Sequence, residues 1–228
     1  MSAEHLVTLA VTAAVTATLV VAARLRPGRW SLVACRILAA VILANEAAWW
    51  VWLAAQGTWS LSYALPLQLC DVAAVVSAAA LLFRKSLLVE LTYFWGLAGT
   101  ANGLITPDIA DPFPSFLFLQ YFIGHGTIVA AALLLVMGLN MAPRQGAVTR
   151  VFGLTFGLLV VDAGANLVTG GNYLYLRHTP AAHSLLDLLG PWPWYIAGAA
   201  AVALLLFVLL DLPFALRRRR WTHLVGVP

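Results

Sequence analysis

Cys70 and His125 combine the chemistry of a nucleophile and a general base, and both stand in long apolar segments. A cysteine attacks as its thiolate, and a histidine at hydrogen-bond distance takes the thiol proton and favours that form. A carboxylate of Asp162 or Glu46 would hold the imidazole in the required tautomer, as in catalytic triads generally. Asn102 would donate a hydrogen bond to an oxyanion. These residue types predict a nucleophilic cysteine site.

Two features of the stretch 65-LPLQLCD-71 modify this prediction. Asp71 is a like charge beside a Cys70 thiolate and disfavours it, but neighbours on a helix diverge by about 100°, so its side chain can face elsewhere. Pro66 is expected to bend the outer end of a helix there. The structural alternative is that Cys70, like the only other cysteine, Cys35, is a buried packing residue, since two cysteines make no disulfide framework.

The elements that must position these residues are set by the composition. Hydrophobic residues make up 62% of the chain, charged residues 10%, and the mean hydropathy is +0.91. A soluble domain carries about 25% charged residues, so we expect the bilayer to be the solvent of this chain. Its long unbroken apolar runs favour helices, which satisfy their own backbone hydrogen bonds in lipid. The fold class is therefore predicted as an all-α polytopic membrane protein.

Seven segments reach the roughly 20 residues that a membrane span needs. They are predicted to form a single seven-helix transmembrane domain over residues 1–228, with spans at 6–23, 32–55, 63–83, 87–105, 115–138, 151–169 and 193–214. Basic residues gather on the odd connectors and in the tail, whereas the even connectors hold only Arg177. The positive-inside rule then puts the N-terminus outside and the C-terminus in the cytoplasm.

Polar residues from five spans are expected to meet in one layer. With a rise of about 1.5 Å per residue, Cys70, His125, Asp162 and Glu46 lie roughly 10–15 Å from the outer end of their spans. Charged groups at such depth usually face the bundle interior, so the layer predicts a polar cavity, with a network that only fixes helix register as the alternative. Candidate substrate-binding residues in or beside it are Asp71, Gln68, Asn166 and Gln120. Glu90 is expected to pair with Arg84 or Lys85 near the cytoplasmic edge.

Smaller patterns predict local features. The stretch 184-SLLDLLG-190 indicates a short interfacial helix with a Ser184–Asp187 capping box, ending at Gly190, and it is either a lid or a plain linker. The spacings Gly99–Gly103 and Gly153–Gly157 are typical of close helix packing. The histidines outside the spans, His5, His178, His183 and His223, are expected to be solvated or interfacial. They lack metal-ligand spacing, so no metal site is predicted.

Several stretches resemble the YwaF-like family of bacterial integral membrane proteins, which is related to the animal transmembrane protein 164. They are 65-LPLQLCD-71, 95-WGLAGTANGLITPD-108, 114-PSFLFLQYFIGHG-126 and 184-SLLDLLGPWPWY-195. The resemblance implies a cysteine-centred acyltransferase that moves fatty acyl chains between phospholipids, with its active cysteine at Cys70 and its essential histidine at His125. It also implies a location in the cell membrane, as a multi-pass protein of a bacterial inner membrane. The family commonly has a histidine two residues before the cysteine, where this chain has Gln68.

Two functions remain open at this level. The first is a phospholipid acyltransferase that passes an acyl chain through a Cys70 thioester to a lysophospholipid. The second is a non-catalytic transporter or sensor that binds a small molecule or lipid in the same cavity. In either case we expect no cofactor. We also expect no nucleic-acid partner, because the basic residues are dispersed at helix ends. The exception, Arg217, Arg218, Arg219 and Arg220, is expected to meet anionic lipid headgroups.

Overall fold

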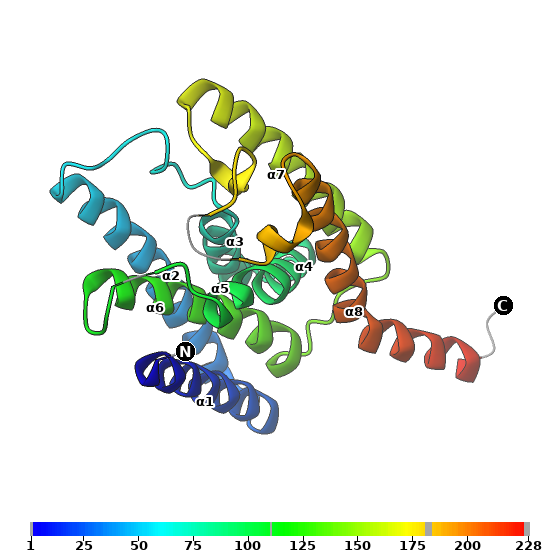
Figure 1. Ribbon diagram of the computed structural model, residues 1–228. Coiled ribbons are helices and arrows are strands. Elements are labelled where there is room, and N and C mark those ends of the chain that lie inside the picture. Colours follow the sequence, from blue (N-terminus) through cyan, green and yellow to red (C-terminus); the bar gives the residue numbers. More distant parts are fainter. Residues whose placement is uncertain (1, 110, 181–183, 226–228) are drawn as a thin grey trace.

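The computed structural model describes residues 2–109, 111–180 and 184–225, with side chains as far as Arg218. Throughout this part of the chain the regular structure is helical, which confirms the predicted class (Figure 1). The α-helices are α1 Ala3–Leu25, α2 Arg29–Ala55, α3 Leu69–Phe83, α4 Ser86–Phe94, α5 Ala101–Ile105, α6 Phe116–Leu133, α7 Ala147–Thr169 and α8 Trp194–Val225. Two π-helical turns, η1 Trp95–Thr100 and η2 Leu134–Gly138, continue α4 and α6, and two 3₁₀ turns, η3 Tyr173–Tyr175 and η4 Leu185–Leu189, lie in the last connector.

Within the described residues, five helices are long and apolar enough to cross a membrane: Ala3–Leu25, Arg29–Ala55, Phe116–Gly138, Ala147–Thr169 and Trp194–Arg218. The two other predicted spans correspond to α3, which has only 15 residues, and to the continuous run of α4, η1 and α5. Large apolar side chains on the long helices stay exposed, as lipid-facing residues do. The chain is therefore a multi-pass membrane protein.

The predicted start of the third span at residue 63 is wrong. The helix α3 begins at Leu69, and the residues before it form turns that carry Pro66. The residue before a proline disfavours the α region, so the chain stays irregular up to that point. The hydroxyl of Tyr173 fixes the segment: it donates to Leu61 O at 2.8 Å and accepts from Leu65 N at 3.0 Å. Pro66 thus precedes the helix instead of bending it, and Cys70 lies in the first helical turn.

The last helix is longer than the span predicted to end at residue 214: α8 continues to Val225 and contains Pro213 in its interior. Arg218, on this cytoplasm-directed extension by the predicted topology, donates to Asp211 Oδ2 at 2.6 Å and to Pro143 O at 2.9 Å. The arginine-rich tail is therefore part of a helix that is tied to the connector before α7.

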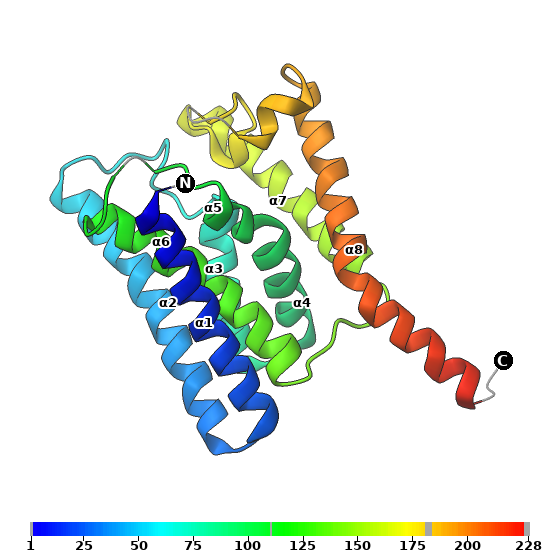
Figure 2. The ribbon, with the colours of Figure 1, turned by 60° about the horizontal axis from the view of Figure 1, so that its bottom comes forward.

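Helices α2, α3, α4 and α6 form the main packed core, and α7 and α8 lie together on the side of the bundle away from α1 (Figures 1 and 2). One of the two glycine pairs contributes to this packing. A Cβ at Gly99 would lie 2.7 Å from Leu69 Cδ2, and one at Gly103 would lie 2.6 Å from His125 Cδ2. Among the described residues, no atom of another segment lies within 4 Å of a Cβ at Gly153 or Gly157, so the prediction of close packing at that second pair is wrong.

Glu90 is buried, and its partners differ from the predicted Arg84 or Lys85. Arg144 Nε donates to its Oε1 at 2.8 Å, and Arg150 Nη2 donates to the same oxygen at 2.9 Å. The chain places these arginines before and within α7, so the ion pairs join α4 to the start of that helix. Arg84 and Lys85 were predicted because they are close to Glu90 in the sequence. In the structure Arg84 ends α3 in a left-handed conformation, and the arginines that pair with Glu90 come from a distant segment.

Candidate functional site

A cavity of about 940 Å³ lies between α2, α3, α5 and α6 on one side and η4 and α8 on the other. This volume is at the upper end of the range for small-molecule sites. Seven of the nine predicted site residues line it: Cys70, His125, Glu46, Asn102, Asp71, Gln68 and Gln120. The tertiary structure thus brings residues from four helical segments to one hollow.

Cys70 lies in the cavity as the second residue of α3. Gln68 precedes the helix and makes no side-chain cap, and within the described residues the backbone N–H groups of Leu69 and Cys70 have no acceptor. Unpaired N–H groups and the positive end of the helix dipole favour an anion at this point. The hydroxyl of Thr100, buried in η1, lies near the thiol without a hydrogen bond of good geometry. Cys70 therefore combines a thiol with a free backbone donor.

His125 is held in a defined orientation by its own helix. Its Nδ1 lies 2.8 Å from the backbone oxygen of Tyr121, and a carbonyl only accepts, so the proton is on Nδ1. The Tyr121 ring stacks on the imidazole with centroids 4.1 Å apart. Gly103 leaves room for the ring edge, since a Cβ there would lie 2.9 Å from Nε2. The other nitrogen, Nε2, is left as a proton acceptor beside the cavity.

Within the described part of the chain, no hydrogen bond joins the Cys70 thiol to His125. Both side chains border the same hollow, and their levels follow from the glycine contacts: Gly103 meets His125, and Gly99, one turn deeper, meets Leu69 beside Cys70. The two groups are thus staggered along the run of η1 and α5. A substrate group that occupies the cavity can lie between them.

The predicted carboxylates have different positions. Glu46 and Asp71 line the cavity and are electrostatic neighbours, and neither is hydrogen-bonded to His125. Asp162 is fully buried, its two carboxylate oxygens have no partner among the described residues, and it does not line the cavity. Asn166 is also outside, because its amide pairs with the backbone N and O of Tyr173. The carbonyl of Tyr121 occupies the position at Nδ1 that the sequence suggested for a carboxylate.

The outer rim includes residues that sequence reasoning missed. Tyr121 donates to Gly103 O at 3.0 Å and accepts from Asp108 N at 3.4 Å, and Tyr175 donates to Asp108 Oδ2 at 3.5 Å. Tyr175 lies in the connector outside the spans, where burial raises its pKa to about 12, so its hydroxyl stays protonated. Gly103 and Asp108, which bond to these tyrosines, both stand in the stretch 95-WGLAGTANGLITPD-108. This stretch was the signal in the sequence that pointed to the rim.

The short helix predicted at 184–190 is present as the 3₁₀ turn η4. Ser184 caps it, Asp187 Oδ2 accepts from Ser184 N at 2.8 Å, and Gly190 ends it with a φ of 98°. Leu189 packs on α8 where a Cβ at Gly198 would come within 3.0 Å of it. Because several η4 side chains line the cavity, the turn is a wall of the site and not a plain linker. His183 lies outside the described residues.

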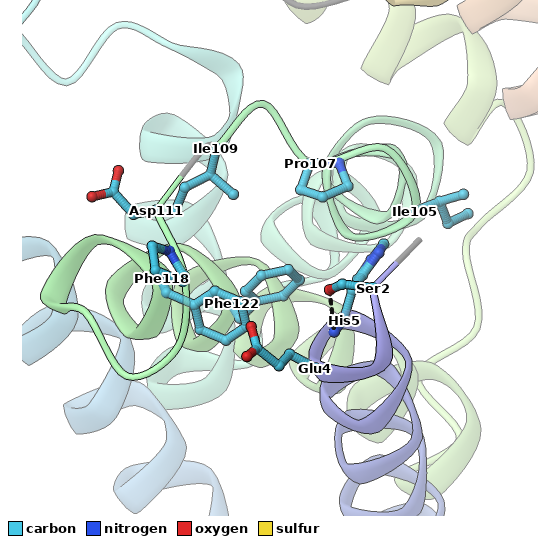
Figure 3. A pocket seen from close by; sticks show the side chains of 10 residues that line it. Ser2, Glu4, His5, Ile105, Pro107, Ile109, Asp111, Phe118 and Phe122 are labelled. Carbon is cyan, nitrogen blue, oxygen red and sulfur yellow. Dashed lines mark hydrogen bonds between the residues drawn. The ribbon is translucent and has the colours of Figure 1, made fainter.

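A second cavity of about 450 Å³ adjoins the first at Ile109 and Asp111 (Figure 3). His5 lies in it, and the expectation that this histidine is solvated is wrong: it is buried, and its Nε2 is 2.7 Å from Leu104 O. Glu4 accepts from Phe113 N at 3.4 Å. The start of α1 is thus anchored to the end of α5 and to the connector that rims the main cavity.

A family model described as the TMEM164 family matches residues 1–211. The chain belongs to the TMEM164 family. This membership confirms the relationship to transmembrane protein 164 that the sequence motifs indicated, and the matched residues include the whole lining of the main cavity. A search of curated proteins and a search of solved structures give no match to the chain.

Proposed function

We propose that this TMEM164-family protein is a membrane phospholipid acyltransferase that carries the acyl chain as a thioester on Cys70. The observation that supports this best is the environment of the thiol: it lies at a helix N-terminus, in a large cavity that also contains an oriented histidine. Apolar side chains of η4 and α8 form the opposite wall, which suits a lipid substrate.

In the first half-reaction, His125 Nε2 takes the Cys70 proton, and the thiolate attacks the ester carbonyl carbon of a phospholipid. The oxyanion that forms accepts hydrogen bonds from the Cys70 N–H, with Asn102 as a second donor, although Asn102 Nδ2 also donates to Ala98 O at 2.7 Å. The ester C–O bond then breaks, and the departing alkoxide takes the proton from Nε2. A lysophospholipid leaves, and the acyl chain remains on sulfur.

In the second half-reaction, a hydroxyl of an acceptor lysophospholipid gives its proton to His125 Nε2 and attacks the thioester carbonyl. The C–S bond breaks, and the proton on Nε2 returns to the Cys70 sulfur. Since the Tyr121 carbonyl keeps the other proton on Nδ1, the imidazole presents the same nitrogen in both halves of the cycle. Asp71, Gln68 and Gln120 are proposed to contact the polar part of the lipid.

The proposed arrangement in the membrane has seven spans, with α3 and the α4–η1–α5 run as the third and fourth. The N-terminus is outside, and the arginines of the tail meet anionic headgroups of the cytoplasmic leaflet. The cavity then opens in the extracytoplasmic half of the cell membrane. The expected substrates are membrane phospholipid and lysophospholipid.

A second candidate is a carrier or sensor that binds a lipid or small molecule in the cavity without chemistry. The observation that favours it is the missing hydrogen bond between Cys70 and His125 in the described structure. Under this alternative the thiol is one lining group among many, and replacing it by a hydroxyl leaves binding intact.

Intact-protein mass spectrometry after incubation with phospholipid vesicles decides between the two candidates. Wild-type protein is expected to gain the mass of an acyl chain, which neutral hydroxylamine removes, whereas Cys70→Ala and His125→Ala gain none. Cys35→Ala is the matched control, because this buried cysteine lies in the packed core away from the cavity. Full transport or binding activity in Cys70→Ser, without any acyl adduct on the wild type, would favour the carrier.

A further inference from the structure

We infer that one stripe of α8, made of Ala199, Val202, Ala203 and Leu206, is the surface along which the acyl chain lies and which selects its length. The inference rests on the proposed function and adds the part of the protein that recognises the hydrocarbon. The four residues have the i, i+3, i+4, i+7 spacing of one helix face, and all of them line the main cavity.

The cavity has an order from polar to apolar that follows the run of α4, η1 and α5. Gly103 meets His125, Gly99 meets Leu69 next to Cys70, and Gly96 meets Ile128. From Gly103 to Gly96 the helix descends by about 10 Å. The imidazole is therefore nearest the outer end, the thiol lies deeper, and an aliphatic side chain of α6 lies deeper still.

The groups above and below the thiol differ in chemistry. Toward the outer end the lining includes Asp108, Asp111, Tyr175 and Ser184, which suit a hydrated headgroup. The lining from η1, α6 and α8 is apolar: Ala98, Ile128, Val202, Ala203 and Leu206. Since α8 begins at Trp194 after the connector, Leu206 is the member of this set farthest from the start of that helix. An ester carbonyl held at Cys70 with its headgroup toward the rim therefore sends its acyl chain along these apolar residues.

Helix α8 forms one wall of the cavity, and its side chains determine the space that is left for the acyl chain. Its stripe extends for about 10 Å from Ala199 to Leu206. Two of its four members are alanines, which leave room in the cavity, and Leu206 is the bulky residue at the end of the stripe farthest from the start of α8. Helix α8 lies with α7 beside the bundle core (Figure 2), and it packs against η4, α7 and η1.

The test measures which chain is transferred to Cys70 from vesicles that contain lauroyl, palmitoyl and stearoyl phospholipids in equal amounts. We expect Leu206→Trp to raise the ratio of lauroyl to stearoyl thioester by about tenfold or more, because shape differences in an apolar pocket discriminate at that level. Leu206→Ala should shift the ratio toward stearoyl. Leu206→Phe replaces the tryptophan variant if that variant does not fold.

Leu205→Trp is the matched control, because Leu205 precedes Leu206 on the same helix and is 58% exposed toward the lipid side. An unchanged ratio in both Leu206 variants, or an equal shift in the Leu205 control, would overturn the assignment. If wild type forms no thioester with any chain, the proposed function fails, and a diazirine-bearing phospholipid still tests the groove. Crosslinks at Val202, Ala203 or Leu206 would support it, and crosslinks confined to Leu205 and Leu209 would refute it.

Discussion

Gly103→Ala is expected to inactivate the site by moving one ring while the bundle stays folded. A Cβ at this position would lie 2.6 Å from His125 Cδ2, 2.9 Å from its Nε2 and 3.1 Å from the Tyr121 hydroxyl. Real Cβ contacts are essentially never shorter than 3.0 Å, so the imidazole edge must retreat by about 0.4 Å or more. The atoms in the way belong to side chains, so the backbone of α5 and α6 can remain in place.

The expected loss follows from the displacement. A shift of about 1 Å in a catalytic group costs roughly 100-fold in rate, so a retreat of about half that distance or more should slow thioester formation by about 10- to 100-fold. This corresponds to about 1.4–2.7 kcal/mol in the activation free energy. The free energy of unfolding should change little, because alanine gains about 1 kcal/mol in helix propensity and overpacking costs about 1–3 kcal/mol.

The assay is the initial rate of hydroxylamine-sensitive acylation of Cys70 in lipid nanodiscs, with thermal unfolding measured on the same samples. Gly157→Ala is the matched control, since no atom lies within 4 Å of a Cβ there and α7 gains only helix propensity. We expect the control to keep the wild-type rate and to be more stable by about 1 kcal/mol. A wild-type acylation rate in folded Gly103→Ala protein would refute the role given to His125.

Three further substitutions separate structural from chemical residues. Glu90→Gln should destabilise the protein by about 2–3 kcal/mol in thermal unfolding, because it removes the buried charge that two partly exposed arginines share, and an unchanged melting temperature would contradict this. Asn166→Leu leaves the backbone N and O of Tyr173 unpaired at about 1–3 kcal/mol each, so the connector after α7 should be cut faster in limited proteolysis than in wild type. Asp162→Leu removes a buried carboxylate without a described partner and should stabilise the fold by about 1–3 kcal/mol with the rate of Cys70 acylation unchanged; a large loss of that rate would return Asp162 to the site.

Much of the architecture was predictable because lipid imposes simple rules. The absence of charge over long segments predicted a helical membrane protein, and five helices of spanning length are present. The Ser184–Asp187 capping box is a local pattern, so it specified η4 without help from the rest of the chain. The start of α3 was missed because leucines on both sides of Pro66 prolong the apolar run, and hydropathy does not distinguish a helical from an irregular apolar segment. Pro66 was the local sign that the helix begins after it.

Most residues of the candidate site were predictable from the sequence, but their hydrogen-bond partners were not. Depth along the spans placed Cys70 and His125 in one layer, and both line one cavity. The partner of the His125 Nδ1 was not predictable, because a backbone carbonyl is available at every residue and leaves no mark in the composition. The predicted depth also placed Asp162 in the site. Depth does not specify the direction in which a side chain points around its helix, and Asp162 does not line the cavity.

By itself, the sequence determined that this chain is a helical membrane protein and that a thiol, an imidazole and several carboxyl and amide groups stand within its apolar segments, because hydropathy and residue spacing mark these segments. Only the tertiary structure decided which of these groups share a cavity and that Gly99 and Gly103 let three helices approach closely. It also decided that η4 and one face of α8 close the cavity with aliphatic side chains. These features depend on how each helix is rotated and where each begins, which contacts between distant segments settle and local patterns do not.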